Sequence, residues 1–214
     1  MIVGVAATAV IASVLFGCAG RWALPFFWAY LGTCLASALV VPWLVEPDLI
    51  RERLMPGPGA EDLPFTLIFL PVSASQFVIA GLDVGRFHWS DAVPVTVQIA
   101  GLLSVVGGLT VACWAMVANP FFSSVIRIQT DRGHRVVADG PYRYVRHPAY
   151  AASPFLLVGT GLALGSWLAT IIGGVLVALV VRRTVAEDCT LRAHLNGYAA
   201  YARKVRHRLV PGVW

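Results

Sequence analysis

Charge is scarce in this chain. Only 13% of its 214 residues are Asp, Glu, Lys or Arg, whereas 58% are hydrophobic. A soluble domain averages about 25% charged residues, so the composition excludes an ordinary soluble protein and favours a membrane protein. Internal repeats, low-complexity tracts and long linkers are also missing, and the length fits one compact helical domain.

The motifs of common catalytic and nucleotide-binding sites are missing as well. The sequence contains no G-x-G-x-x-G, no P-loop, no H-E-x-x-H and no serine in a nucleophile-elbow setting. Cys18, Cys34 and Cys113 lie in apolar runs and are expected to be small core residues. Cys189, beside a polar cluster, is either reactive or packed. This inventory predicts neither covalent catalysis nor tight metal binding.

The basic residues are unevenly placed. Twelve of the sixteen Lys and Arg follow Asn119, against four of the eleven acids. They flank apolar spans, so the positive-inside rule explains them better than a nucleic-acid surface. The basic segment 121–147 and the basic C-terminal tail are therefore expected in the cytoplasm, and counting spans places the N-terminus there too. Because Arg outnumbers Lys fifteen to one, we expect a bacterial inner-membrane protein.

The apolar runs predict an all-α, polytopic membrane protein with about six membrane helices. Four spans are expected in Met1–Gly20, Trp22–Val45, Pro64–Leu82 and Ala92–Ala118, with polar loops at Glu46–Leu63 and Asp83–Asp91. The first span lacks a basic region before it, which favours a membrane helix over a cleaved signal peptide.

The next apolar stretch, Pro148–Val181, has 34 uncharged residues, too many for one helix and too few for two full spans. We expect two shortened helices in a hairpin that turns near Gly165-Ser166, with a kink at Pro154. Helical character continues to Leu195. An amphipathic helix, Tyr198–Arg206, then either lies on the membrane surface or closes over a site.

Two polar clusters bracket this hairpin: GPYRYVRHPAY at Gly140–Tyr150 and RRTVAED at Arg182–Asp188. Charge beside hydrocarbon is costly, so a membrane protein rarely places it there without a function. The hairpin would bring both clusters to one membrane face, where we expect the active site.

Structural explanations compete with this interpretation. Arg143 and Arg146 have the placement of arginines that anchor to lipid headgroups. His147, before a proline, has the position of a helix N-cap. Arg183 and Glu187 are spaced as an ordinary helical ion pair. The occurrence of both clusters around one short hairpin favours a functional site over these explanations.

Both clusters, together with the terminal YAAYARKVRHRLVPGVW, resemble the isoprenylcysteine carboxyl methyltransferase family over Val125–Trp214. Members are integral membrane enzymes that use S-adenosylmethionine. The resemblance implies N-terminal membrane helices over residues 1–118, and a cofactor-binding region with a catalytic hairpin over 119–214, in one integrated domain. It implies a catalytic, substrate-contacting role for Arg183. The implied cofactor contacts are Gln129, His134, Arg135, Val136, Val137, Tyr142, His147, Pro148, Ala149, Tyr150 and Glu187.

The resemblance implies methylation of the carboxylate of an isoprenylcysteine-like lipophilic substrate. Such a carboxylate is already ionised at neutral pH and needs no general base. Arg183 would hold it, the lipid tail would enter from the bilayer, and the cofactor would arrive from the cytoplasm. The expected partners are therefore a lipophilic or prenylated substrate and membrane lipid.

Three alternatives stay open at this point. A phospholipid N-methyltransferase would need a base such as His134 to deprotonate the amine. A sterol-type membrane reductase would bind NADPH instead. A non-catalytic membrane protein or small transporter is the third, although the sequence places no charge at mid-span, where a transport path would be expected.

Overall fold

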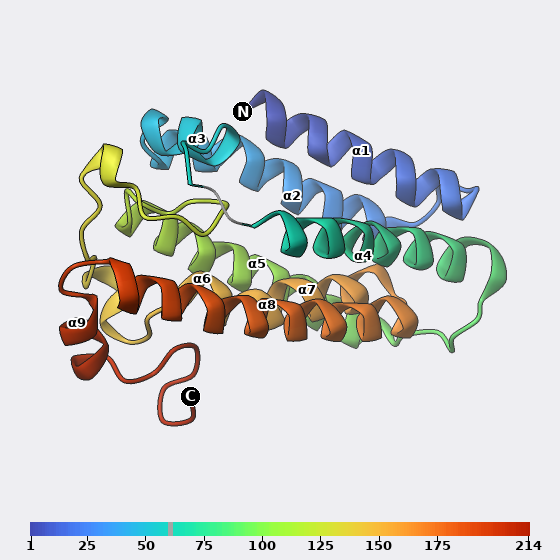
Figure 1. Cartoon of the computed structure of the whole chain (residues 1–214). Helices are drawn as coiled ribbons and strands as arrows, with labels where there is room; N and C mark the ends of the chain where they lie inside the picture. Colours follow the sequence, from blue (N-terminus) through green and yellow to red (C-terminus); the bar gives the residue numbers. More distant parts are fainter. Residues whose placement is uncertain (60–61) are drawn as a thin grey trace.

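The computed structural model describes residues 1–59 and 62–214, and their regular structure is entirely helical. The long helices lie side by side (Figure 1). They are α1 (Ile2–Ala19), α2 (Pro25–Leu44), α4 (Leu63–Leu82), α5 (Val95–Ala118) and α8 (Trp167–His194). The short helices are α3 (Pro47–Leu54), α6 (Pro148–Ala151), α7 (Ser153–Leu164) and α9 (Tyr198–Lys204). The all-α prediction is confirmed.

Five helices are long and apolar enough to cross a membrane: α1, α2, α4 with its π-helical extension Asp83–Phe87, α5 and α8. Their outward surfaces stay apolar, since Ile2 is 81% exposed and Trp43 is 84% exposed. Exposed apolar surface of this extent requires a hydrocarbon environment or a partner. By the length and composition of its helices, the chain is an integral membrane protein.

The predicted hairpin is present, but its arms are unequal. The first arm is short and breaks at Ala152 between α6 and α7, with Pro154 in the first turn of α7. The chain turns at Gly165, whose φ of 81° suits glycine. The second arm was expected to be short. Its apolar part and the predicted helical continuation to Leu195 form one helix, α8, which runs unbroken for 28 residues, about 42 Å, because no proline interrupts it. This helix carries Arg183 and Glu187 beyond the apolar run.

The predicted polar loop Glu46–Leu63 contains a helix, α3. Pro47 occupies its first turn, Asp48 follows at the positive end of the helix dipole, and two arginines occupy its last turn. Leu49 and Glu52 are buried, so α3 is held by packing as well as by the favourable placement of its charges. Ala60 and Glu61 of this loop lie outside the described residues.

A buried amide fixes α4 against both arms of the hairpin. Gln76 is 2% exposed, and its Nε2 donates hydrogen bonds to the carbonyls of Leu157 at 2.7 Å and Ala169 at 2.9 Å. Close to this point the arms touch at Gly161, where a Cβ would lie 2.3 Å from the backbone nitrogen of Thr170. The hairpin and α4 therefore form one tightly packed unit.

Helix α3, the segment 119–147, helix α9 and the C-terminal segment gather at one end of the bundle, toward which both chain ends also lie (Figure 1). The two polar clusters are thereby brought to the same end. Which compartment this end faces stays a prediction.

Candidate active site

A cavity of about 440 Å³ opens at this end, between α4, the segment 119–150, α8 and α9. Its size falls within the range of about 300–1,000 Å³ that is common for small-molecule sites. Its lining has a polar and aromatic part and an apolar part, which are called the polar wall and the apolar wall below. The apolar wall includes Phe65, Phe69, Leu156 and Val180.

The structure brings all but one of the sequence-predicted site residues around this cavity. Those that line it are His134, Arg135, Val136, Val137, Tyr142, His147, Pro148, Ala149, Tyr150, Arg183 and Glu187. Gln129 is the exception: it is fully buried, its Nε2 donates to the carbonyl of Phe121 at 2.7 Å, and its Oε1 accepts from Arg132. It shapes the loop from behind the cavity.

Glu187 lies in the cavity beside two aromatic residues. Its Oε2 accepts a hydrogen bond from the Tyr150 hydroxyl at 2.7 Å, and its Oε1 lies 3.8 Å from Nδ1 of His147. The rings of His147 and Tyr150 stack with their centroids 5.8 Å apart. The side chain of Glu187 keeps 27% exposure, so this carboxylate can face a bound cation.

Arg183 pairs with Asp62 instead of forming the helical ion pair with Glu187. One Nη of Arg183 contacts the Asp62 carboxylate and also donates to the carbonyl of Ser124 at 2.8 Å. The guanidinium lies over the ring of Phe65, 4.5 Å from its centroid. Arg183 thus stands where the polar and apolar walls meet.

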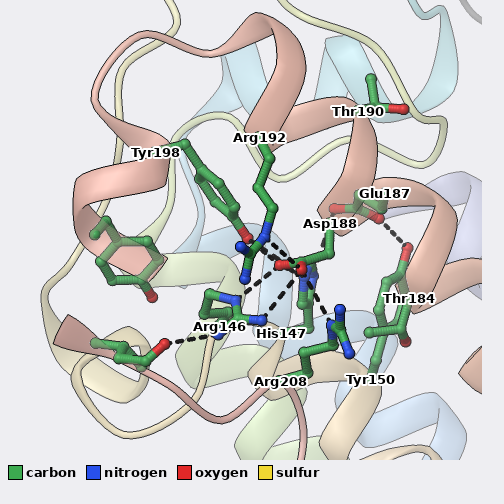
Figure 2. A network of polar contacts seen from close by, with 12 residues as sticks. Arg146, His147, Tyr150, Thr184, Glu187, Asp188, Thr190, Arg192, Tyr198 and Arg208 are labelled. Carbon is green, nitrogen blue, oxygen red and sulfur yellow. Dashed lines mark hydrogen bonds and ion pairs between the residues drawn. The ribbon is translucent and has the colours of Figure 1, made fainter. Parts of the chain in front are cut away.

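Asp188, next to Glu187, is the centre of a buried polar network (Figure 2). Its Oδ1 accepts from Nε of Arg146 at 2.7 Å and from the Tyr198 hydroxyl at 3.0 Å, and lies 3.4 Å from Nε2 of His147. Asp188 itself is fully buried and does not line the cavity. Its three partners do line it, so Asp188 orients cavity residues from behind.

The same carboxylate fastens the C-terminal segment. Its Oδ2 accepts from Arg192 and from Arg208, each at 3.0 Å. Arg146 adds hydrogen bonds from Nη1 to the carbonyls of Val205 at 2.7 Å and Arg206 at 2.8 Å. The tail is therefore tied to the polar cluster that begins the hairpin.

Helix α9 closes over the cavity, which supports one of its two predicted placements. Tyr198 and Tyr201 are buried and line the cavity, whereas Arg203 on the opposite side is exposed. The Tyr201 hydroxyl donates to the carbonyl of Tyr142 at 2.6 Å. Burial raises the pKa of all three tyrosines, so their hydroxyls stay protonated. The hydroxyl of Tyr142 accepts a hydrogen bond from the Asn119 amide at 3.2 Å.

His134 is neutral in this site. Burial, and after it the charge of Arg127, lowers its pKa below the ordinary value of about 6.5. Its Nδ1 accepts from the backbone N–H of Gln129 at 3.3 Å, which assigns the proton of the neutral ring to Nε2. In this tautomer the free nitrogen donates and cannot take a proton from a substrate.

An ion triad joins α3 to the segment that follows α5. Arg127 has a side chain only 1% exposed and meets Glu52 through two contacts of 2.7 Å and Asp131 through contacts of 2.8 and 3.2 Å. Gly57 lies against it, since a Cβ there would come within 2.8 Å of Nη2. The hydrogen bonds from Arg127 lower the pKa of Glu52.

This shift predicts a pH-dependent stability. A carboxylate with a depressed folded-state pKa stabilises the fold above its unfolded pKa of about 4.3, and that contribution is lost as the pH falls through the folded value. We expect Glu52→Gln to cost about 1.5–3 kcal/mol at pH 7. The difference from the unmutated protein should shrink below about pH 4. Thermal unfolding in detergent at several pH values measures this.

The matched control is Glu46→Gln, which changes an exposed acid next to the same helix. Its effect is expected to be small and nearly independent of pH. A Glu52→Gln difference that stayed constant from pH 7 to pH 3 would contradict the assigned ion pair.

Three contributors were not among the predicted cofactor and substrate contacts: Asp188 and Arg146, which belong to the two polar clusters, and Asp62. Asp188 and Arg146 are 42 positions apart in the chain, and no local spacing pairs them. A signal was nevertheless present for Asp188, because an acid directly after an apolar helix, beside Glu187, needs a partner when buried. Asp62 gave no sequence signal for its contact with Arg183.

Comparison with known proteins agrees with the resemblance read from the motifs. Residues 96–195 match the family described as phospholipid methyltransferase. A protein-S-isoprenylcysteine O-methyltransferase of Schizosaccharomyces pombe is 33% identical over 90 residues, 41% of this chain and 38% of that protein. Probable protein-S-isoprenylcysteine O-methyltransferases of Oryza sativa, subspecies indica and japonica, are 34% identical over 116 residues, 53% of this chain and 61% of theirs. The match thus covers 38% to 61% of the length of these relatives, less than two-thirds of each.

Proposed function

We propose that the region matching the phospholipid methyltransferase family, residues 96–195, is the catalytic part of an S-adenosylmethionine-dependent membrane methyltransferase. Its acceptor is the carboxylate of an isoprenylcysteine-like lipophilic molecule. The observation that carries the proposal is the cavity: residues of both polar clusters line it, and Arg183 stands between its polar and apolar walls.

The residues present fit the proposed cofactor. The Glu187 carboxylate faces the cavity and suits the positive charge of a sulfonium or amino group. Aromatic rings of Phe121, Tyr142 and Tyr150 line the same space, and such rings attract both cations and flat heterocycles. When bound, S-adenosylmethionine supplies an electrophilic methyl group on its sulfonium.

The residues of the chain then have to align the acceptor with the methyl group of the cofactor and shield both from water. Holding two reactants in line can lower a barrier by about 7–11 kcal/mol, and α9 with its two buried tyrosines restricts water at the cavity. Arg183 binds the acceptor carboxylate. Because Asp62 already neutralises part of its charge, Arg183 leaves the carboxylate oxygen that attacks the methyl group more nucleophilic.

The second candidate is methylation of a phospholipid amine, which the description of the matched family favours. An ammonium headgroup would have to lose a proton first. His134, the expected base, donates from Nε2 and has its Nδ1 engaged by the backbone. Arginines face the cavity as well, and they repel a cation. The carboxylate acceptor is therefore preferred.

We further propose that the end of the bundle carrying the cavity faces the cytoplasm of a bacterial cell. The positive-inside rule supports this orientation, because the basic segment 121–147 and the basic tail lie there. Water-soluble cofactor would enter from that side, and the acceptor's tail would reach the apolar wall from the bilayer.

Ligand binding tests the proposal. We expect calorimetry on the detergent-purified protein to show micromolar binding of S-adenosylhomocysteine and no binding of NADPH. Glu187→Gln should weaken this affinity about tenfold, the value of one charge-assisted hydrogen bond, and Glu46→Gln should leave it unchanged. Labelled methyl transfer to an isoprenoid carboxylate should accompany binding. Binding of NADPH alone would reassign the chain to the reductases.

A further inference from the structure

A second arginine faces the cavity from the N-terminal half of the chain. Arg53 lies in the last turn of α3, outside the region that matches the methyltransferase family. It lines the cavity and is half-buried. Its guanidinium sits 4.9 Å from the ring centroid of Phe122, and its Nη1 is 3.5 Å from the carbonyl of that residue, at the outer limit of a hydrogen bond.

The other buried arginines of the cavity are neutralised by acids. Arg127 pairs with Glu52 and Asp131, Arg146 with Asp188, and Arg183 with Asp62. For Arg53, none of the acids in residues 1–59 and 62–214 lies within ion-pair distance. Arg135 also lines the cavity, but it is exposed to water. Arg53 is therefore the half-buried arginine of the cavity that has no acidic partner among the described residues.

The electrostatic surroundings of Arg53 also favour an anionic partner for its guanidinium. Burial lowers its pKa, and the charge of Arg183 lowers it further against an opposing effect of Tyr150. A guanidinium stays charged despite such shifts. An anion between the two arginines would relieve both the desolvation and the repulsion.

Arg183 has donors to spare for that anion. Its side chain is 10% exposed, and its Nε is buried without a hydrogen-bond partner among the described residues. A buried, unpaired donor is costly and calls for a ligand. One short segment links the two arginines, because Arg183 donates to the carbonyl of Ser124 while the Ser124 hydroxyl donates to the carbonyl of Arg53 at 3.0 Å.

We infer that Arg53 and Arg183 together bind the acidic group of the acceptor, and that α3 thereby selects anionic over amine acceptors. The tail of the acceptor would run along Phe65 and Phe69, since the Arg183 guanidinium already lies over Phe65. This inference rests on the proposed methyltransferase function. It adds a substrate-binding residue from the half of the chain that the family match does not reach.

The test separates the charge of the acceptor from its shape. With S-adenosylhomocysteine bound, calorimetry compares N-acetyl-S-farnesylcysteine, its methyl ester and the free isoprenoid acid farnesoic acid. Arg53→Gln is expected to weaken binding of the preferred acid about 10- to 100-fold and to leave the uncharged ester unchanged. Arg53→Lys should restore part of the preference. The wild-type protein will bind one of the two acids, the farnesylcysteine derivative or farnesoic acid, more tightly. That acid identifies the class of molecule that supplies the carboxylate.

Arg51→Gln is the matched control, because Arg51 is exposed on the same helix and does not line the cavity. Unchanged affinity for S-adenosylhomocysteine verifies that each variant is folded. If Arg53→Gln keeps the full preference of acid over ester, the inference is overturned. If wild type binds the acid through Arg53 but transfers no methyl group to it, the proposed function fails while the anion site stands.

Discussion

Replacing Asp188 with asparagine is expected to weaken S-adenosylhomocysteine binding at least tenfold and to destabilise the fold by about 3–5 kcal/mol. The substitution keeps the size of the side chain and removes its charge. The guanidinium groups of Arg146, Arg192 and Arg208 would then face one another without a counter-charge. Arg146 is 3% exposed, so water cannot compensate for the loss.

Calorimetry and limited proteolysis measure the two consequences of Asp188→Asn. The C-terminal segment should become sensitive to protease, because Arg208 and Arg146 no longer tie it to the hairpin. Asp139→Asn, at an exposed acid, is the control. Adding Arg192→Gln to Asp188→Asn should recover part of the stability, since it removes one of the repelling charges. Wild-type affinity with a protected tail would contradict the assigned role.

Replacing Arg183 with alanine is expected to lower kcat/KM for a carboxylate acceptor about 100-fold, equivalent to about 2.7 kcal/mol. The reason is the loss of a fixed, charge-assisted contact to the nucleophile at the junction of the two walls. Affinity for S-adenosylhomocysteine should stay within about twofold. Steady-state methyl transfer together with calorimetry distinguishes these effects.

Arg183→Ala also leaves the buried carboxylate of Asp62 without its ion-pair partner. Asp62→Asn controls for this, because it breaks the same ion pair and keeps the arginine. It should lose far less methyl transfer than Arg183→Ala if Arg183 acts on the acceptor, because only the partial neutralisation of the guanidinium is removed. Equal losses in both variants would mean that the ion pair matters for folding and that Arg183 does not bind the acceptor.

Much of the fold was predictable because hydrocarbon imposes a simple length requirement. Each uncharged run long enough to span a bilayer became a helix, as Met1–Gly20 became α1 and Trp22–Val45 became α2. Turn positions were also predictable where glycine alone fits, as at Gly165. Helix α3 was predicted as a loop, because proline and charged residues are typical of loops. In this segment they stand at the positions that they also favour at the two ends of a helix.

The candidate site was predictable only as a set of residues, and their roles as ligand contacts stay predictions. Helical spacing favoured a pair between Arg183 and Glu187, yet the fold supplies each with a partner from elsewhere: Asp62 for the first and Tyr150 for the second. Those partners lie far away in sequence. Local periodicity carries no information on such contacts, and tertiary packing decides them.

The hydrogen bonds of Gln76 have a consequence for biosynthesis. Its acceptors, the carbonyls of Leu157 and Ala169, belong to helices that the ribosome makes long after α4. Until they arrive, the amide of α4 has no partner in the hydrocarbon, where an unmade hydrogen bond costs several kcal/mol. The contact therefore forms late, after α7 and α8 have inserted. It then fixes the depth of these two helices in the bilayer relative to α4.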